Sequence, residues 1–115
     1  MRLEGSNDYF TKDMKKMILK MRIMARIKYG KVYSYGLVKE FGDSHFAKMM
    51  GSSLKNDIYN TITSLKKGGY IRESKKIEKG RAKKYYTITR RGESVMKSAT
   101  LIQKETLREI SKLFK

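Results

Sequence analysis

Near the middle of the chain, the pattern of residues changes from that of a helix to that of a β-hairpin. Residues 57–67 carry apolar side chains at helical spacing, and Gly68 and Gly69 follow them directly. Adjacent glycines favour the end of a helix, because glycine readily adopts the backbone angles that close a helix C-terminus. Residues 70–72 and 85–89 then have the composition of two β-strands, with a cation-rich segment between them. A helix, a glycine stop and a basic hairpin in this order predict a winged helix-turn-helix.

The chain is strongly basic, and its charge is concentrated in that hairpin. Its 115 residues include 28 Lys+Arg and 11 Asp+Glu, for a net charge of +17. Residues 66–91 hold eleven of the cations and two of the anions, so this segment carries +9 of the total. A polyanionic partner is therefore expected, and nucleic acid and an anionic membrane both qualify.

Several classes of protein do not fit this sequence. No apolar run approaches the roughly 18 residues that span a bilayer, and the N-terminus lacks the apolar segment of a signal peptide. The absence of cysteine removes disulfides, thiolate zinc sites and cysteine nucleophiles. The sequence also lacks a nucleophile elbow, a phosphate-cradling glycine loop and a carboxylate pair beside a histidine. We therefore expect a cytoplasmic protein that is not an enzyme and uses no membrane, metal or cofactor.

The first predicted helix runs from Asp8 to about Lys28, with Asn7 or Asp8 as its cap. Apolar residues recur along one stripe and others widen it, so the helix is expected to be buried on more than one side. The stripe consists of Met14, Met17, Ile18, Met21, Met24 and Ala25, and the wider set adds Phe10, Leu19, Ile23 and Ile27. We interpret the methionines as core-filling side chains. The alternative is that the methionines line an adaptable ligand pocket. A small-molecule effector is possible, but nothing else in the sequence indicates one.

The segment after this helix contains short elements. Gly30 ends the first helix, residues 31–33 can form a short strand, and Ser34 is the expected cap of a second helix over 35–41. Residues 45–51 fit either a short helix or a loop with apolar anchors. They begin with the single histidine of the chain, which cannot build a metal site alone.

The next helix, from Ser53 to Lys67, has two distinct faces. At about 100° per residue its apolar side chains fall in one narrow stripe, which must face the core. This stripe consists of Leu54, Ile58, Ile62 and Leu65. The opposite face and its flanks are polar, and asparagine, serine, threonine and lysine can all bond base edges or phosphates in a major groove. We expect DNA contacts from Ser53, Asn56, Tyr59, Asn60, Thr63 and Lys67, with Ser53, Asn56, Tyr59 and Asn60 nearest the bases. Asp57 would repel phosphate, although it suits the positive N-terminal end of the helix.

The hairpin is expected to form the wing. By strand alternation its inward residues are Ile71, Ile77, Tyr86 and Ile88. The turn between the arms lies within residues 78–82, where Gly80 supplies a positive φ. Cations at the wing tip can straddle phosphates or enter the adjacent minor groove. The predicted DNA-binding residues of the wing are Lys79, Gly80, Arg81, Lys83 and Lys84.

Three segments within residues 31–92 resemble the PadR-like transcriptional regulators, a family of the winged-helix superfamily. Residues 59–71 are similar to the family's tyrosine, alternating leucines, glycine and isoleucine. Residues 80–92 are similar to its Gly-Arg-Pro-basic-basic-Tyr-Tyr wing, and residues 33–37 are similar to the start of its second helix. The resemblance implies that Tyr59 contacts operator DNA and that Gly80, Arg81 and Lys83 belong to the wing. Ala82 replaces the wing proline, and Asn60 replaces the proline that often follows the tyrosine.

The last predicted helix, over residues 91–114, is longer than a small winged-helix core requires. Its apolar stripe consists of Val95, Ala99, Ile102, Ile110 and Leu113, with Met96, Leu107 and Phe114 beside it. This stripe is expected to meet a second copy of the chain, with help from the first helix, which is also the dimerisation mode that the resemblance implies. A two-fold dimer would place two recognition helices about 34 Å apart on an inverted-repeat operator. The alternative is that the helix packs back on its own domain.

The expected fold is therefore mainly α with a small β-hairpin: a winged helix-turn-helix with long N- and C-terminal helices for dimerisation. The expected organisation is a flexible tail over residues 1–7, a DNA-binding domain over 8–92 and a dimerisation helix over 93–115. The expected function is sequence-specific regulation of transcription through double-stranded DNA, as a homodimer. Two alternatives remain: a non-specific architectural or RNA-associated binder, in which the charge supplies the affinity, and a winged helix used for protein contact.

Overall fold

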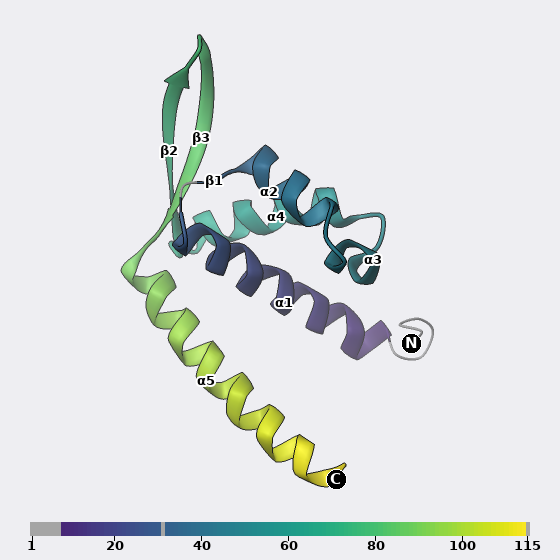
Figure 1. The fold of residues 1–115 in the computed structure, drawn as a ribbon. Helices are drawn as coiled ribbons and strands as arrows, with labels where there is room; N and C mark the ends of the chain where they lie inside the picture. The colour runs from purple at the N-terminus through teal and green to yellow at the C-terminus, as the bar shows by residue number, and fades with distance from the viewer. Residues whose placement is uncertain (1–7, 31, 115) are drawn as a thin grey trace.

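The computed structural model describes residues 8–30 and 32–114, and over these the chain is mostly helical with a small antiparallel sheet (Figure 1). The predicted tail over residues 1–7 lies outside the described residues. In chain order the elements are α1 (Asp8–Lys28), β1 (Val32–Tyr33), α2 (Ser34–Gly42), α3 (Phe46–Met50), α4 (Leu54–Lys67), β2 (Ile71–Glu78), β3 (Arg81–Ile88) and α5 (Arg90–Leu113). This order confirms the predicted winged helix-turn-helix class.

A single hydrophobic core lies between α1, α2, α4 and the base of the sheet. Its fully buried side chains come from three different helices, and they are Leu19, Ile23, Leu37 and Ile58. The predicted core stripe of α4 is confirmed, because Leu54, Ile58, Ile62 and Leu65 are all buried. Burying one such side chain contributes about 1.5–3 kcal/mol, so this stripe fixes which face of α4 is left for solvent.

The predicted stripe of α1 is wrong in part. Met14 and Met17 are 60% and 46% exposed, whereas the supposedly secondary residues Leu19, Ile23 and Ile27 are buried. These two sets lie on roughly opposite sides of the helix at about 100° per residue. The methionine side of α1 therefore faces largely away from the core of this chain.

The sheet has the strand order β1-β3-β2, and both pairings are antiparallel. Glu78 pairs with Arg81, which leaves Lys79 and Gly80 as a two-residue turn with φ angles of 51° and 75°. Two positive φ angles match the right-handed twist of the strands, so the hairpin extends straight from the domain as a narrow wing. Figure 1 shows the wing standing clear of the helices.

The inward side of the hairpin is only partly as predicted. Ile71 and Tyr86 are buried and Ile88 is half-buried, but Ile77 is 81% exposed. Strand alternation places Ile77 on the same side of the hairpin as Ile71, yet only the base of the hairpin lies over the helices. Alternation therefore predicts correctly which side of the hairpin a side chain lies on. It does not predict how far along the hairpin the helices cover that side.

Two predictions on the short elements are resolved. Ser34 is the first residue of α2, and Tyr33 occupies the cap position, so the predicted serine cap is wrong. The Ser34 hydroxyl instead lies 3.3 Å from the Tyr86 hydroxyl. Residues 46–50 form the short helix α3, which decides between the two interpretations of this segment. Of the predicted strand, Lys31 lies outside the described residues.

The start of α5 is bonded to the end of α4. The Thr89 hydroxyl donates to the Gly69 carbonyl at 2.7 Å and accepts from the Gly92 amide at 3.1 Å, which caps α5. The Thr89 amide also donates to the Tyr70 carbonyl at 3.1 Å. Gly92 is buried in this joint. From it α5 runs away from the domain (Figure 1). Every residue from 101 to 114 is exposed.

Candidate nucleic-acid interface

The polar face of α4 is open to solvent along its whole length. Asn56, Asn60, Thr63 and Lys67 are exposed and lie opposite the buried stripe, as the helical spacing predicts. Ser53 precedes the helix and is exposed, and Tyr59 is 38% exposed on one flank. The Thr63 hydroxyl donates to the Tyr59 carbonyl at 3.0 Å, so it retains only acceptor capacity for a ligand. This face therefore offers two free amide groups and an ammonium to a partner.

The first turn of α4 holds its one acidic side chain in place. The Ser53 hydroxyl donates to Asp57 Oδ2 at 2.9 Å. Asp57 also lies in the first turn, where the helix dipole favours a negative charge. Asp57 is half-buried and sits on the flank of the polar face rather than at its centre. It stabilises the helix start but places a negative charge beside the polar face.

The wing and α4 share one hollow in the surface. An open hollow of about 520 Å³ is lined by Tyr33, Ser34, Tyr35, Tyr59, Arg81, Ala82, Lys83 and Lys84. It brings together four of the predicted contact residues, Tyr59 from α4 and Arg81, Lys83 and Lys84 from the wing. Ser53 and Asn60 border a different hollow, against α1. Asn56, Thr63 and Lys67 line neither of these hollows, and Lys79 and Gly80 stand farther out in the turn.

Four residues that line the shared hollow were not among the predicted contact residues: Tyr33, Ser34, Tyr35 and Ala82. The rings of Tyr33 and Tyr35 stack with centroids 6.4 Å apart, and the Tyr33 ring also meets Tyr85 edge-on at 6.1 Å. Lys83 Nζ lies 5.0 Å from the centre of the Tyr33 ring and 3.8 Å from Glu78 Oε2. Lys83 is thus held against the sheet instead of standing free at the tip. The alternating tyrosines of residues 33–35 were the available signal, because aromatic rings beside cations are typical of nucleic-acid surfaces.

Hydrogen bonds from the tyrosines organise the wing. The Tyr85 hydroxyl donates to Glu78 Oε1 at 2.9 Å, and this bond, together with partial burial, raises the pKa of Tyr85. Tyr85 therefore stays a neutral donor at physiological pH. Its bond spans seven residues across the hairpin and ties the outer part of β2 to β3.

A single carboxylate links α4 to both strands of the wing. Glu73 Oε1 accepts from Lys66 Nζ at 3.2 Å and from the Tyr86 hydroxyl at 3.4 Å, and Lys84 Nζ lies 4.0 Å away. Burial raises the pKa of Glu73, but the bond and charge of Lys66, the charge of Lys84 and the Tyr86 bond outweigh burial and leave the pKa lowered. Glu73 thus remains ionised near neutral pH and joins the last turn of α4 to both strands of the wing.

Replacing this carboxylate tests the link. Glu73→Gln is expected to lower the free energy of unfolding at pH 7 by at most about 1 kcal/mol, the usual size of a partly exposed ion pair. Because the folded-state pKa is lowered, the contribution of Glu73 is present above its unfolded-state pKa and is lost as the pH falls through the folded-state pKa. Urea unfolding at pH 7 and at pH 3 measures the difference from wild type. Glu105→Gln, which removes a carboxylate paired with Arg108 on α5, is the control. A deficit of Glu73→Gln that persists at pH 3 would contradict the assignment.

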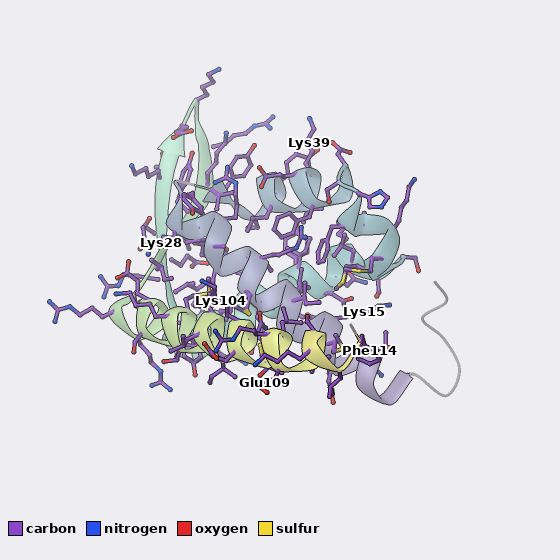
Figure 2. All side chains as sticks on the ribbon, turned by 60° about the horizontal axis from the view of Figure 1, so that its bottom comes forward. Lys15, Lys28, Lys39, Lys104, Glu109 and Phe114 are labelled. Atoms are coloured by element: carbon purple, nitrogen blue, oxygen red, sulfur yellow. The ribbon has the colours of Figure 1, made fainter. Side chains whose placement is uncertain are left out.

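The predicted dimerisation residues are uncovered in the single chain. Val95, Ile102, Ile110 and Leu113 are 41%, 64%, 45% and 78% exposed, and Ala99 is half-buried. Leu101 and Leu107, elsewhere on the same helix, are also exposed. The alternative in which this helix packs back on its own domain is wrong for residues 101–114. Figure 2 shows the side chains of α5 projecting into solvent as far as Phe114.

The described part of the chain contains neither a metal-binding cluster nor a membrane-spanning helix. Over residues 8–30 and 32–114, no three His, Cys, Asp or Glu side chains gather closely enough to hold a metal ion. None of the helices in this part of the chain is both long and apolar enough to cross a bilayer.

Comparison with known proteins gives a family match. A model described as the transcriptional regulator PadR-like family matches residues 23–98, which covers the elements from the last turns of α1 to the start of α5. No curated protein sequence gives a significant match.

Solved structures of this type have the same fold. A PadR-like transcriptional regulator from Bacillus cereus superposes with a TM-score of 0.73 at 23% identity, covering 90% of this chain and 97% of that one. A PadR family regulator from Eggerthella lenta gives 0.72 at 18% identity, with 94% and 91% covered. PadR from Bacillus subtilis, solved in complex with operator DNA, gives 0.61 at 23% identity over 72% of this chain and 46% of that one.

Proposed function

Because the chain belongs to the PadR-like family of transcriptional regulators, we propose that it binds duplex DNA with α4 in the major groove and the wing on the adjacent backbone or minor groove. The polar face of α4 carries the base contacts. Asn56 and Asn60 can each bond an adenine edge through two hydrogen bonds, and Lys67 can reach a guanine or a phosphate. Ser53 lies at the N-terminal end of the same face and Tyr59 on its flank. The Thr63 hydroxyl can accept a hydrogen bond.

The wing supplies affinity more than sequence choice. Lys79, Arg81 and Lys84 are exposed, and Gly80 lets the backbone turn sharply at the tip. Lys83 acts from within the hollow that the wing shares with Tyr59. Contacts from such cations to phosphates position a protein on DNA, whereas contacts to base edges choose the site.

The observation that carries this proposal is the shared hollow, because it joins the two parts of the predicted interface. An exposed polar helix face alone is common on globular proteins. Here α4, the start of α2 and the basic wing converge on one surface, with Glu73 linking α4 and the wing by an ion pair. The B. subtilis relative bound to operator DNA supports the same use of this fold.

We further propose that the chain acts as a homodimer on an inverted-repeat operator. The exposed apolar stripe of α5 and the exposed methionine side of α1 are the surfaces that a second copy would cover. A regulator of this kind works where the DNA lies, so the cytoplasm is the proposed location. A small-molecule effector is not required by the proposal.

Selection from a random duplex pool tests the proposed function. We expect enrichment of an inverted repeat that is bound roughly 10³-fold or more above scrambled DNA. Binding without enrichment but with a steep salt dependence would instead identify a charge-driven coater of nucleic acid. Failure to bind any duplex at moderate salt would favour a winged helix used for protein contact.

Alanine variants of the α4 face locate the sequence discrimination. Asn56→Ala and Asn60→Ala are each expected to cost about 1–3 kcal/mol of discrimination against the wrong base, because each removes a two-bond base contact. Competition between the selected duplex and single-base variants measures this. Thr100→Ala on α5 is the matched surface control and should leave discrimination unchanged. Equal losses on selected and scrambled DNA would show that the asparagines contact only the backbone.

A further inference from the structure

The flank of α4 opposite Tyr59 borders a second groove, whose wall on α1 has no part in the proposed interface. This groove lies between α1 and α4 and has a volume of about 650 Å³. Its wall on α1 consists of Thr11, Lys12, Lys15, Lys16, Leu19 and Lys20. Its opposite wall consists of Met50, Ser53, Asp57, Asn60, Thr61 and Ser64. Two predicted contact residues, Ser53 and Asn60, therefore belong to both the α4 face and this groove.

The lysines of the groove lie on the side of α1 that also carries its buried apolar residues. At about 100° per residue, Lys12, Lys16 and Lys20 fall on the same side of the helix as the buried Leu19 and Ile23. This side of α1 is apolar where it covers the core and basic where it passes α4. Lys12, Lys16 and Lys20 follow at four-residue intervals and span about 12 Å of the helix axis. Figure 2 shows Lys15 on this N-terminal half of α1, far from Lys28 at the other end.

The positive charge of this row is not neutralised within the described residues. The ion pairs there within 4.0 Å join Arg26 to Glu40, Lys66 and Lys84 to Glu73, Lys83 to Glu78, Arg108 to Glu105 and Lys112 to Glu109, and none of them includes a lysine of the groove. The acidic side chain in the groove is Asp57, which accepts a bond from Ser53. Four lysines and one aspartate leave a net charge of about +3 beside the polar face of α4.

A helix in a major groove has a sugar-phosphate strand on each side. The major groove of DNA is about 12 Å wide, close to the diameter of a helix with its side chains. Both DNA strands therefore come near the flanks of a helix that lies in it. In the proposed interface, Arg81, Lys83 and Lys84, which line the hollow on the Tyr59 flank, would face one strand. We propose that Lys12, Lys15, Lys16 and Lys20 of α1 bind backbone phosphates of the other strand. This inference rests on the proposed function.

The row also resolves the placement of Asp57. A negative charge on this flank would repel the strand beside it if it stood alone. The α1 lysines face Asp57 across the groove and reverse the sign of the flank as a whole. Met14 and Met17, which the proposed dimer would cover, lie on the opposite side of α1, so the row stays accessible in a dimer.

The salt dependence of DNA binding tests the row. Lys16→Gln combined with Lys20→Gln removes two exposed cations and keeps helix-forming residues, so the fold is retained. The control is Lys97→Gln combined with Lys104→Gln, which removes the same charge from the side of α5 opposite its apolar stripe. Fluorescence anisotropy with the selected duplex and with scrambled duplex, over a salt series, gives the slope of log affinity against log salt.

We expect the α1 variant to lower the magnitude of this slope by about 1.8 per bound chain, at about 0.9 per phosphate contact. Both duplexes should lose affinity by the same factor, because phosphates carry no sequence information. The α5 control should keep the wild-type slope. Equal slopes for the two variants would overturn the inference while leaving the proposed function intact. Absence of any duplex binding by the wild-type protein would overturn the proposed function itself.

Free phosphate is the other source of the same chemistry, and a second arm separates it from DNA. Wild type and the α1 variant are titrated with inorganic pyrophosphate by calorimetry. One outcome is that wild type binds pyrophosphate saturably, the α1 variant does not, and the salt slope of DNA binding is the same for both. This outcome would identify a small-anion site and overturn the assignment to DNA. A changed salt slope without saturable pyrophosphate binding supports the backbone contact.

Discussion

Gly92→Ala is expected to lower the free energy of unfolding by about 3 kcal/mol, more than a methyl group added to any other glycine within residues 8–30 and 32–114. A Cβ at this position would meet the Tyr70 carbonyl oxygen below van der Waals distance and the Ile88 Cγ1 at 2.7 Å. The first contact is with backbone, which cannot rotate away as a side chain can. Overpacking of this kind costs about 1–3 kcal/mol, and displacement of the Gly92 amide from its Thr89 cap adds about 1 kcal/mol.

Thermal and urea unfolding measure the effect. A fall in Tm of roughly 10 °C or more is expected for a domain of this size. Gly42→Ala is the matched control: this glycine lies in the last turn of α2, and nothing lies within 4 Å of its added Cβ. Alanine there should be neutral or stabilise by up to about 1 kcal/mol. A Gly92→Ala protein as stable as wild type would mean that α5 does not meet the hairpin as the structure places it.

The second large effect concerns the apolar stripe of α5. The wild-type chain is expected to sediment as a dimer, and Ile102→Glu combined with Ile110→Glu should raise the dimer dissociation constant by at least roughly 100-fold. The reason is that an unpaired carboxylate buried at an interface costs several kcal/mol, and each 1.4 kcal/mol is a factor of ten. Sedimentation equilibrium without DNA measures the constant directly.

A charge-matched control separates the stripe from the general effect of added negative charge. Thr100→Glu combined with Ser111→Glu places two carboxylates on exposed positions away from the stripe, at about 100° per residue. This variant should dimerise as the wild type does. A wild-type chain that sediments as a monomer at every concentration tested would contradict the dimer outright, and equal weakening by both pairs would place the interface elsewhere.

The fold class followed from the sequence because its elements are specified locally. The buried stripe of α4 and the glycine stop after it are both patterns of a few residues, and both are confirmed. The family resemblance is confirmed by the match over residues 23–98. The turn at Gly80 was also predictable, because the positive φ there favours glycine.

The predictions that were wrong concern which surfaces of the helices and strands pack against one another. Ile77 alternates correctly but lies beyond the reach of the helices, so no periodicity could reveal its exposure. In α1, Met14 and Met17 lie on one side and Leu19, Ile23 and Ile27 on the other, and the sequence does not state which side faces its own core. Ser34 and Tyr33 were missed as neighbours of the wing because their partners lie more than 50 residues away in the chain.

The candidate site was predictable in composition but not in arrangement. Helical spacing placed Asn56, Asn60, Thr63 and Lys67 on one exposed face. It could not show that Tyr59 lies in the hollow of the wing or that Ser53 and Asn60 face α1, because those facts depend on the packing of other elements against α4.

The hydrogen bonds between Thr89 and the segment that ends α4 have a consequence for how binding sites change over evolution. Thr89 bonds both Gly69 and Tyr70, so the start of α5 is joined directly to the segment that follows α4. In the proposed dimer, the angle at which two α5 helices cross would therefore set how far apart the two half-sites lie. The bases within each half-site would be chosen by separate residues, those of the proposed contact face of α4. Spacing and sequence of the operator can then diverge independently, through substitutions in different helices.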